Sequence, residues 1–134
     1  MGNLKGCFSH ESDHWRTPSD IYKKYMDDGY IDPCPYMADF DGLKIDYFNK
    51  KLFINPPYSK ISIWVDYAIR QYERGGCKIV LLIPARTDTK YFHKLLEYHP
   101  EIIFVKGRLH FNDSKCAAPF PSLFIILEGK EVEK

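Results

Sequence analysis

The sequence predicts an α/β fold in which a mostly parallel β-sheet carries helices on both faces. Short apolar segments alternate with amphipathic segments of about 12–15 residues, the pattern of strands joined by crossover helices. The segment 79–83, Ile-Val-Leu-Leu-Ile, is apolar at every position, as expected of a strand buried on both faces. Asp32, Asn55 and Pro84 each directly follow an apolar segment. They should therefore meet along the carboxyl edge of the strands, where sheets of this class bind ligands.

The size and composition of the chain are those of a single domain. It has 134 residues, of which 45% are apolar and 16% aromatic, enough to form a core. We expect a flexible N-terminal arm at 1–13, the domain at 14–128 and a charged C-terminal tail at 129–134. The net charge of +1 means that contact with nucleic acid would depend on a local patch. Neither a signal peptide nor an apolar run of membrane length occurs, so we expect a cytoplasmic protein without membrane contact.

The N-terminal part of the domain is expected to form a helix and a short strand. Thr17 is placed as the helix N-cap, with Pro18 at the first helical position and Gly29 at the end. The helix would turn four side chains inward: Ile21, Tyr22, Tyr25 and Met26. A strand at 30–31 would stop at Asp32-Pro33. The loop at 33–49 is long for a compact domain, and such loops are often functional.

The remaining elements follow in alternation. A strand at 51–55 precedes an amphipathic helix that ends at Gly75-Gly76. The strand at 79–83 is closed by Pro84, and a second helix at about 88–99 is stopped by Pro100. Segments 102–105 and 123–127 are predicted as two further buried strands.

The segment Asn55-Pro56-Pro57-Tyr58 carries the clearest chemical signal. Neither proline can donate to a sheet ladder, so the strand ends there, and the two rings keep the turn stiff. An amide, a proline carbonyl and an aromatic ring should then surround one point. Such a corner suits a planar group that carries an amine, because the oxygens accept its N–H groups and the ring stacks on its plane.

These four residues resemble the corner of the amino-group methyltransferases that use S-adenosylmethionine. Further segments occur in the order expected of that group: 14–18 (HWRTP), 32–34 (DPC), 84–89 (PARTDT), 107–111 (GRLHF) and 120–122 (FPS). Together they are similar to the phage-type DNA adenine methyltransferase (Dam) family, over residues 13–127. The resemblance implies a reduced Rossmann-like methyltransferase fold, encoded by a phage or prophage and acting in the host cell.

The resemblance implies direct methyl transfer to the exocyclic amine of an adenine that is flipped out or single-stranded. The expected catalytic residues are Asn55, Pro56, Pro57 and Tyr58. Asn55 Oδ1 and the Pro56 carbonyl would accept the two N–H groups of the amine, and Tyr58 would stack on the base. Both acceptors are fixed before reaction, so no titrating general base is required.

The resemblance also implies a site for S-adenosylmethionine. A dinucleotide-type glycine-rich loop is absent, and this cofactor has no phosphate that would need one. The expected cofactor-binding residues are Trp15, Thr17, Pro18, Asp32, Pro33, Cys34 and Asp41. Asp32 would lie beside the methionine moiety, and Asp39 is the alternative to Asp41 near the ribose or adenine. Pro35 departs from the alanine that many relatives carry.

Residues near the same edge are candidates for DNA contact: Ser59, Lys60, Arg86, Thr87, Arg108 and Phe111. For each cation the alternative is an ordinary solvated charge, and for Phe111 it is burial in the core. We expect no metal site. Cys7, His10 and His14 could supply three ligands, but no fourth ligand is evident and no Cys-x-x-Cys pair occurs.

Other functions remain open at this point. The same motif occurs in enzymes that methylate protein glutamine or ribosomal-RNA guanine, and the companion segments favour DNA adenine. A different class is a non-catalytic subunit that binds nucleic acid or cofactor in a larger complex. With so short a chain, a homodimer or a partner subunit could supply target recognition.

Overall fold

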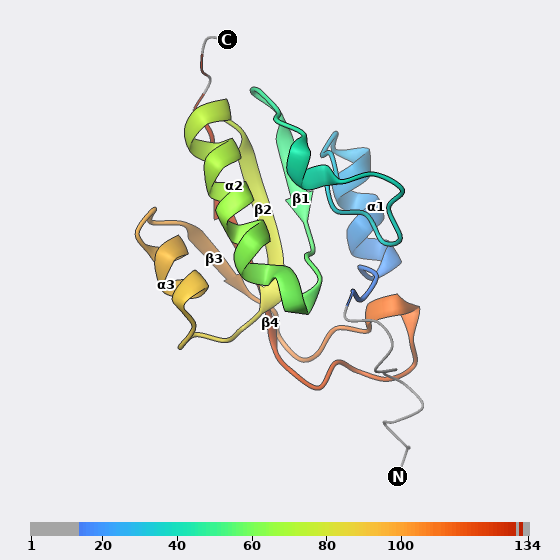
Figure 1. Cartoon of the computed structure of the whole chain (residues 1–134). Helices are drawn as coiled ribbons and strands as arrows, with labels where there is room; N and C mark the ends of the chain where they lie inside the picture. The colour runs from blue at the N-terminus through green and yellow to red at the C-terminus, as the bar shows by residue number, and fades with distance from the viewer. Residues whose placement is uncertain (1–13, 131, 133–134) are drawn as a thin grey trace.

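The structure of the protein is a computed structural model that describes residues 14–130 and 132. The described residues form a four-stranded sheet with helices around it (Figure 1). The strands are β1 (Lys51–Ile54), β2 (Lys78–Pro84), β3 (Glu101–Phe104) and β4 (Ser122–Leu127). The α-helices are α1 (Ser19–Asp27), α2 (Ile61–Gly75) and α3 (Lys90–Leu96). The 3-10 turns are η2 (Gly42–Lys44), η3 (Tyr58–Lys60) and η4 (Phe111–Asp113). The expected arm at 1–13 lies outside the described residues.

The sheet is mixed, so the prediction of a mostly parallel sheet is wrong. Its order is β1-β2-β4-β3; β1 and β2 are parallel, and β4 is antiparallel to both β2 and β3. A parallel neighbour needs a connection that crosses back to the starting end of the sheet, usually through a helix. The connection at 105–121 contains only the turn η4, so the chain re-enters the sheet from the end at which β3 leaves it.

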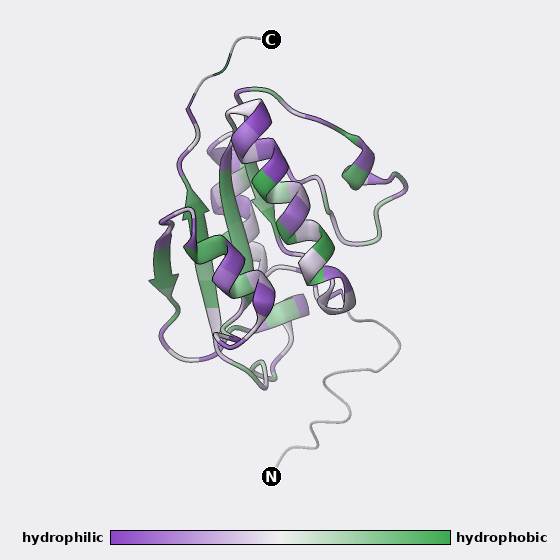
Figure 2. Ribbon diagram, turned by 60° about the vertical axis from the view of Figure 1, so that its left-hand side comes forward, coloured by the Kyte–Doolittle hydropathy of each residue, from purple (hydrophilic) through white to green (hydrophobic). Residues whose placement is uncertain are grey.

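Helices cover both faces of the sheet, as the sequence predicts (Figure 1). On β1 the side chains alternate: Leu52 and Ile54 pack in the cluster that contains α2 and α3, and Phe53 packs in the cluster that α1 covers. Apart from the charged first residues of β1, β2 and β3, the strands are mainly hydrophobic, whereas the helices mix both kinds of residue (Figure 2). Among the described residues, none of the helices has the length and apolar character needed to cross a bilayer.

Two predicted strands differ from expectation. The segment at 30–31 forms a single parallel bridge, between Ile31 and Leu52, rather than a full strand. The segment at 102–105 forms β3, but this is an edge strand and not a buried one, with Ile103 44% and Phe104 70% exposed. A short apolar run indicates a strand but does not say whether a neighbour covers it.

Candidate functional site

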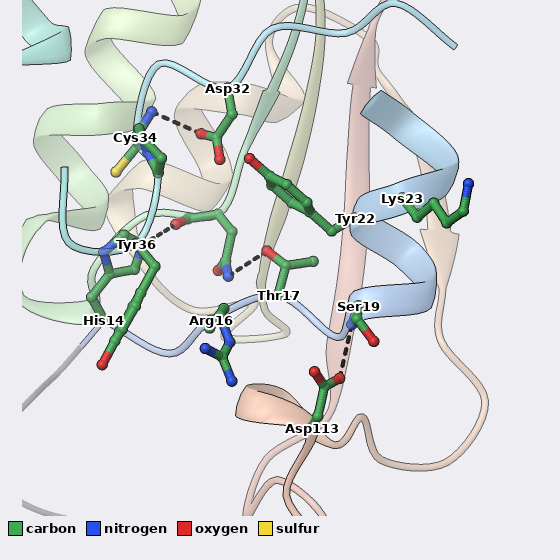
Figure 3. Close-up of a pocket in the computed structure, with 12 residues that line it drawn as sticks. His14, Arg16, Thr17, Ser19, Tyr22, Lys23, Asp32, Cys34, Tyr36 and Asp113 are labelled. Carbon is green, nitrogen blue, oxygen red and sulfur yellow. Dashed lines mark hydrogen bonds between the residues drawn. The ribbon is translucent and has the colours of Figure 1, made fainter. Parts of the chain in front are cut away.

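A cavity of about 310 Å³ lies at the carboxyl end of β1 (Figure 3). Four separate stretches of the chain build its walls: the segment 14–23, the loop after Ile31, the end of β1 and the turn η4. The lining residues are His14, Arg16, Thr17, Ser19, Tyr22, Lys23, Asp32, Cys34, Pro35, Tyr36, Asn55 and Asp113. Asp32 and Asn55, which the sequence predicts to share an edge, line this same cavity.

Asn55 is held at the end of β1 by three hydrogen bonds. Its side chain is nearly buried, at 6% exposure, and its Nδ2 donates to the Trp15 carbonyl at 2.7 Å and to Thr17 Oγ1 at 3.0 Å. Its backbone carbonyl lies 2.9 Å from His14 Nε2. Pro56, which follows, is buried. The amide is therefore fixed before any ligand binds.

Asp32 places a carboxylate in the cavity and has no ion-pair partner among the described residues. The Cys34 N–H donates to Oδ1 at 2.8 Å, and the Tyr22 hydroxyl points toward the carboxylate (Figure 3). Burial nevertheless raises the pKa of Asp32 to about 6, because the hydrogen bonds from Cys34 and Tyr22 offset only part of the desolvation cost. None of the ion pairs between described residues involves Asp32. A cationic ligand group would find a favourable partner here.

The two side chains beside Asp32 stay neutral at ordinary pH. Burial, and then the Asp32 charge, raises the pKa of the Tyr22 hydroxyl to about 12. The same causes raise the pKa of the Cys34 thiol to about 12, so Cys34 is not a thiolate nucleophile. Both groups act as hydrogen-bonding or packing walls of the cavity.

Thr17 does not cap the first helix, so that prediction is wrong. Helix α1 begins at Ser19, and Pro18 in the N-cap position offers no side-chain acceptor. The Ser19 N–H donates instead to Asp113 Oδ1 at 2.9 Å (Figure 3). This hydrogen bond is the main reason why the pKa of Asp113 is lowered. The cap thus comes from η4, which leaves the Thr17 hydroxyl for Asn55.

The segment before α1 is also held by η4. Asn112 Oδ1 accepts from the Arg16 N–H at 2.6 Å, and the Asn112 N–H donates to the Arg16 carbonyl at 2.8 Å. Asn112 and Asp113 both have positive φ angles, 59° and 51°, a conformation that Asn and Asp tolerate better than most residues. Both backbone polar groups of Arg16 are therefore paired across the cavity wall.

An aromatic cluster lies behind the Asn55 corner. It consists of Trp15, Tyr58, Phe111 and Phe120, with the Trp15 and Tyr58 ring centroids 4.9 Å apart. The Tyr58 hydroxyl is buried without a hydrogen-bond partner among the described residues, and burial raises its pKa well above the usual range. Phe111 is 2% exposed and packs in the core, so the structure favours the core interpretation for this residue.

The predicted cofactor-binding residues divide into two groups. Thr17, Asp32 and Cys34 line the cavity. The other four lie outside its lining. Trp15 is in the aromatic cluster, and Pro18 is the N-cap of α1. The Pro33 carbonyl packs directly against Gly42, and Asp41 caps η2 by accepting from the Leu43 N–H at 3.1 Å.

The predicted DNA-contacting residues other than Phe111 are exposed: Ser59, Lys60, Arg86, Thr87 and Arg108. Arg108 also donates to the Ala118 carbonyl at 3.3 Å. Pro57 and Lys60 line a second hollow of about 370 Å³, which shares His14, Cys34 and Tyr36 with the first cavity. Residues 14–130 and 132 contain no group of three potential metal ligands, and Cys7 and His10 lie outside that range.

Gly42 fixes the loop that carries Asp32, which leads to a first prediction. A Cβ at Gly42 would lie 1.7 Å from the Pro33 carbonyl oxygen, so any other residue must push the two segments apart. Gly42→Ala should therefore cost about 1–3 kcal/mol of folding free energy, as overpacked sites do. Thermal unfolding measures this cost. An unfolding temperature of Gly42→Ala equal to that of the parent protein would contradict the packing argument.

Sequence reasoning missed several walls of the cavity. Ser19, Tyr22 and Lys23 share one face of α1, and their spacing of three and four residues next to Thr17 could have indicated them. Asp113 has no such local signal, because its contact with Ser19 spans 94 residues.

The chain matches the family model described as DNA N-6-adenine-methyltransferase (Dam) over residues 7–123. It is also similar to a protein of Escherichia phage T1 named DNA N-6-adenine-methyltransferase, with 38% identity over 61 residues. The matched segment makes up 46% of this chain and 25% of the phage protein, so it covers about a quarter of that relative's length.

Proposed function

Because the chain belongs to the DNA N-6-adenine-methyltransferase (Dam) family, we propose that it transfers a methyl group from S-adenosylmethionine to the exocyclic amine of adenine in DNA. The observation that carries the proposal is that Asn55 and Asp32 line one cavity. One residue suits a neutral amine and the other a cation, which are the two partners that the reaction must bring together.

The cavity residues fit a cofactor that carries both positively and negatively charged groups. S-adenosylmethionine, when bound, supplies an electrophilic methyl group on a sulfonium. Asp32 is a partly buried carboxylate that forms no ion pair among the described residues, so it would hold the ammonium or face the sulfonium side. Arg16 and Lys23 also line the cavity and would hold the cofactor's carboxylate. Cys34 completes this wall as a neutral group.

Asn55 and Pro56 would bind the amine. The lone pair of an adenine amine is delocalised into the ring, which makes the nitrogen a weak nucleophile. When Asn55 Oδ1 and the Pro56 carbonyl accept its two N–H groups, more electron density stays on the nitrogen. Both acceptors belong to a proline-stiffened turn, so little reorganisation is required during the reaction.

The base must reach this corner from a flipped or single-stranded nucleotide. Tyr58 would stack on it only after the Trp15 ring, now 4.9 Å away, gives up its contact with Tyr58. Phe111 is too deeply buried to form the opposite wall, and we leave it out of the proposed contacts. The exposed residues Lys60, Arg86 and Arg108 would meet phosphates.

Transfer of a labelled methyl group tests the proposal. The purified protein is incubated with methyl-labelled S-adenosylmethionine and, separately, duplex DNA, single-stranded DNA, ribosomal RNA and a glutamine-containing release factor. Digestion and mass spectrometry should find the label on the N6 atom of adenine in DNA. Label confined to RNA guanine or to protein glutamine would contradict the substrate, and no transfer to any of them would contradict the activity.

A further inference from the structure

The side-chain amide of Asn55 can face the cavity in two ways. Its oxygen accepts hydrogen bonds and its nitrogen donates them, yet the two ends have almost the same size. The proposed reaction needs Oδ1 of Asn55 to face the amine. If Nδ2 faced it instead, the N–H donors of Asn55 would point at the N–H donors of the amine, and no hydrogen bond could form. The protein must therefore contain something that selects one orientation.

The contacts of Nδ2 make this selection. It donates to the Trp15 carbonyl at 2.7 Å and to Thr17 Oγ1 at 3.0 Å, which uses both of its hydrogens. A carbonyl can only accept, so turning the amide over would bring two oxygens to about the same short distance. Oδ1 is left on the side away from these two acceptors.

The position of Thr17 in the fold frees its hydroxyl for this task. A threonine before a proline at a helix start would ordinarily cap the helix, but here Asp113 occupies that role through Ser19. Thr17 and Asn55 are each 6% exposed, so water does not compete for the bond between them. Pro18 also restricts Thr17 to an extended backbone.

The two acceptors flank a residue whose backbone is locked. Trp15 and Thr17 stand on either side of Arg16, whose N–H donates to Asn112 Oδ1 and whose carbonyl accepts from the Asn112 N–H. His14, on the same segment, contacts the Asn55 carbonyl at 2.9 Å. The acceptors and the amide therefore keep a fixed relation to each other.

We propose that Thr17 is a positioning residue which, with the Trp15 carbonyl, turns Asn55 Oδ1 toward the amine of the substrate. The proposal rests on the proposed methyl transfer. It assigns Thr17 to the amine side of the reaction, whereas the sequence placed it on the cofactor side. Thr17 acts through Asn55 and need not touch either substrate.

Thr17→Val tests the proposal, because valine keeps the shape and removes the acceptor. The kcat for DNA methylation should fall about 10- to 100-fold, as expected when a reacting group loses its orientation. The KM for S-adenosylmethionine should stay within about twofold. Thr17→Ser should restore kcat. Tyr67→Phe is the control, since it removes a buried hydroxyl that donates to the Ile45 carbonyl away from the cavity, and this variant should lose stability but not kcat.

Other results would overturn the proposal. An unchanged kcat in Thr17→Val would show that the amide needs no help from Thr17. A raised KM with unchanged kcat would place Thr17 on the cofactor instead. If Thr17→Val does not fold, Thr17→Ala removes the same oxygen without adding a methyl group, and the same criteria apply to it.

A spectroscopic measurement separates this proposal from the activity itself. In nitrogen-15 spectra, the side-chain NH₂ signals of Asn55, assigned by their loss in Asn55→Ala, should show slow exchange in the parent protein and in Thr17→Ser. They should shift and exchange faster in Thr17→Val. Identical signals in all three proteins would contradict the anchoring even if the parent protein were inactive. If the signals shift in Thr17→Val but the parent protein has no methyl-transfer activity, the anchoring of Asn55 is supported and the proposed methyl transfer is contradicted.

Discussion

Replacement of Asn55 by alanine is expected to reduce methyl transfer to DNA by at least about 100-fold, the usual cost of removing one preorganised polar group at a reacting centre. The variant loses the acceptor Oδ1 and with it the hydrogen bond that Asn55 would accept from the amine. It also leaves the Trp15 carbonyl and the Thr17 hydroxyl without their donor. Single-turnover transfer of labelled methyl groups gives the rate, and calorimetry gives the cofactor Kd, which should change little because Asp32 is intact.

Asn49→Gly provides the matched control. Asn49 lies before the other end of β1, with a φ of 56° that glycine adopts without strain, and its amide contacts Val132 rather than the cavity. This variant should keep its methyl-transfer rate. Full activity in Asn55→Ala, or an equal loss in both variants, would remove Asn55 from the mechanism.

Replacement of Asp32 by asparagine should weaken cofactor binding by about 2–5 kcal/mol, because one charge of a buried pair is removed. Asparagine keeps the shape and can still accept from the Cys34 N–H. Calorimetric titration measures the change in Kd. Asp66→Asn is the control, since Asp66 is exposed on α2 and does not line the cavity. An unchanged Kd in Asp32→Asn would contradict the role of this carboxylate.

The same variant should change how stability depends on pH. The pKa of Asp32 rises from its ordinary value of 3.8 to about 6 in the folded protein, so the folded state binds a proton more tightly than the unfolded state does. Its contribution to stability is fully present below pH 3.8 and is lost as pH rises through 6. The difference corresponds to about 3 kcal/mol. Without cofactor, Asp32→Asn should therefore be more stable than the parent at pH 7.5 and equal to it below pH 3.8.

Chemical unfolding of both proteins at several pH values checks this expectation. The comparison cancels the groups that titrate in both proteins, so the remaining difference belongs to Asp32. Saturating cofactor should reduce the advantage of the variant, because a bound cation compensates the parent's carboxylate. A parent protein that is more stable than Asp32→Asn at pH 7.5 would contradict the uncompensated charge.

Local sequence patterns predicted the elements well where one periodicity dominates. Helix α2 follows the spacing of Ile61, Trp64 and Val65, and it ends at Gly76 with a φ of 66°. Strand β2 is apolar from Ile79 to Pro84 and lies inside the sheet. The common cavity of Asp32 and Asn55 was also predictable, because each follows a segment that pairs in parallel with its neighbour.

Features that depend on distant contacts were not predictable in this way. The direction of β4 follows from how the connection at 105–121 returns to the sheet, and no single segment encodes that return. The cap of α1 looked local, with Thr17 in a favoured position, but Asp113 supplies it instead. The sequence does not show whether Phe111 faces a ligand or the core, because an aromatic side chain suits both places; in the structure it is buried.

The two hydrogen bonds between Arg16 and Asn112 join residues that are 96 positions apart. During translation, the residues up to Tyr58 leave the ribosome long before η4 has been synthesised. A nascent chain of that length already contains Asp32 and the proline corner, but it lacks the Asp113 wall and both backbone bonds to Arg16. Release of a prematurely ended product would consequently yield a chain in which the cavity is never closed.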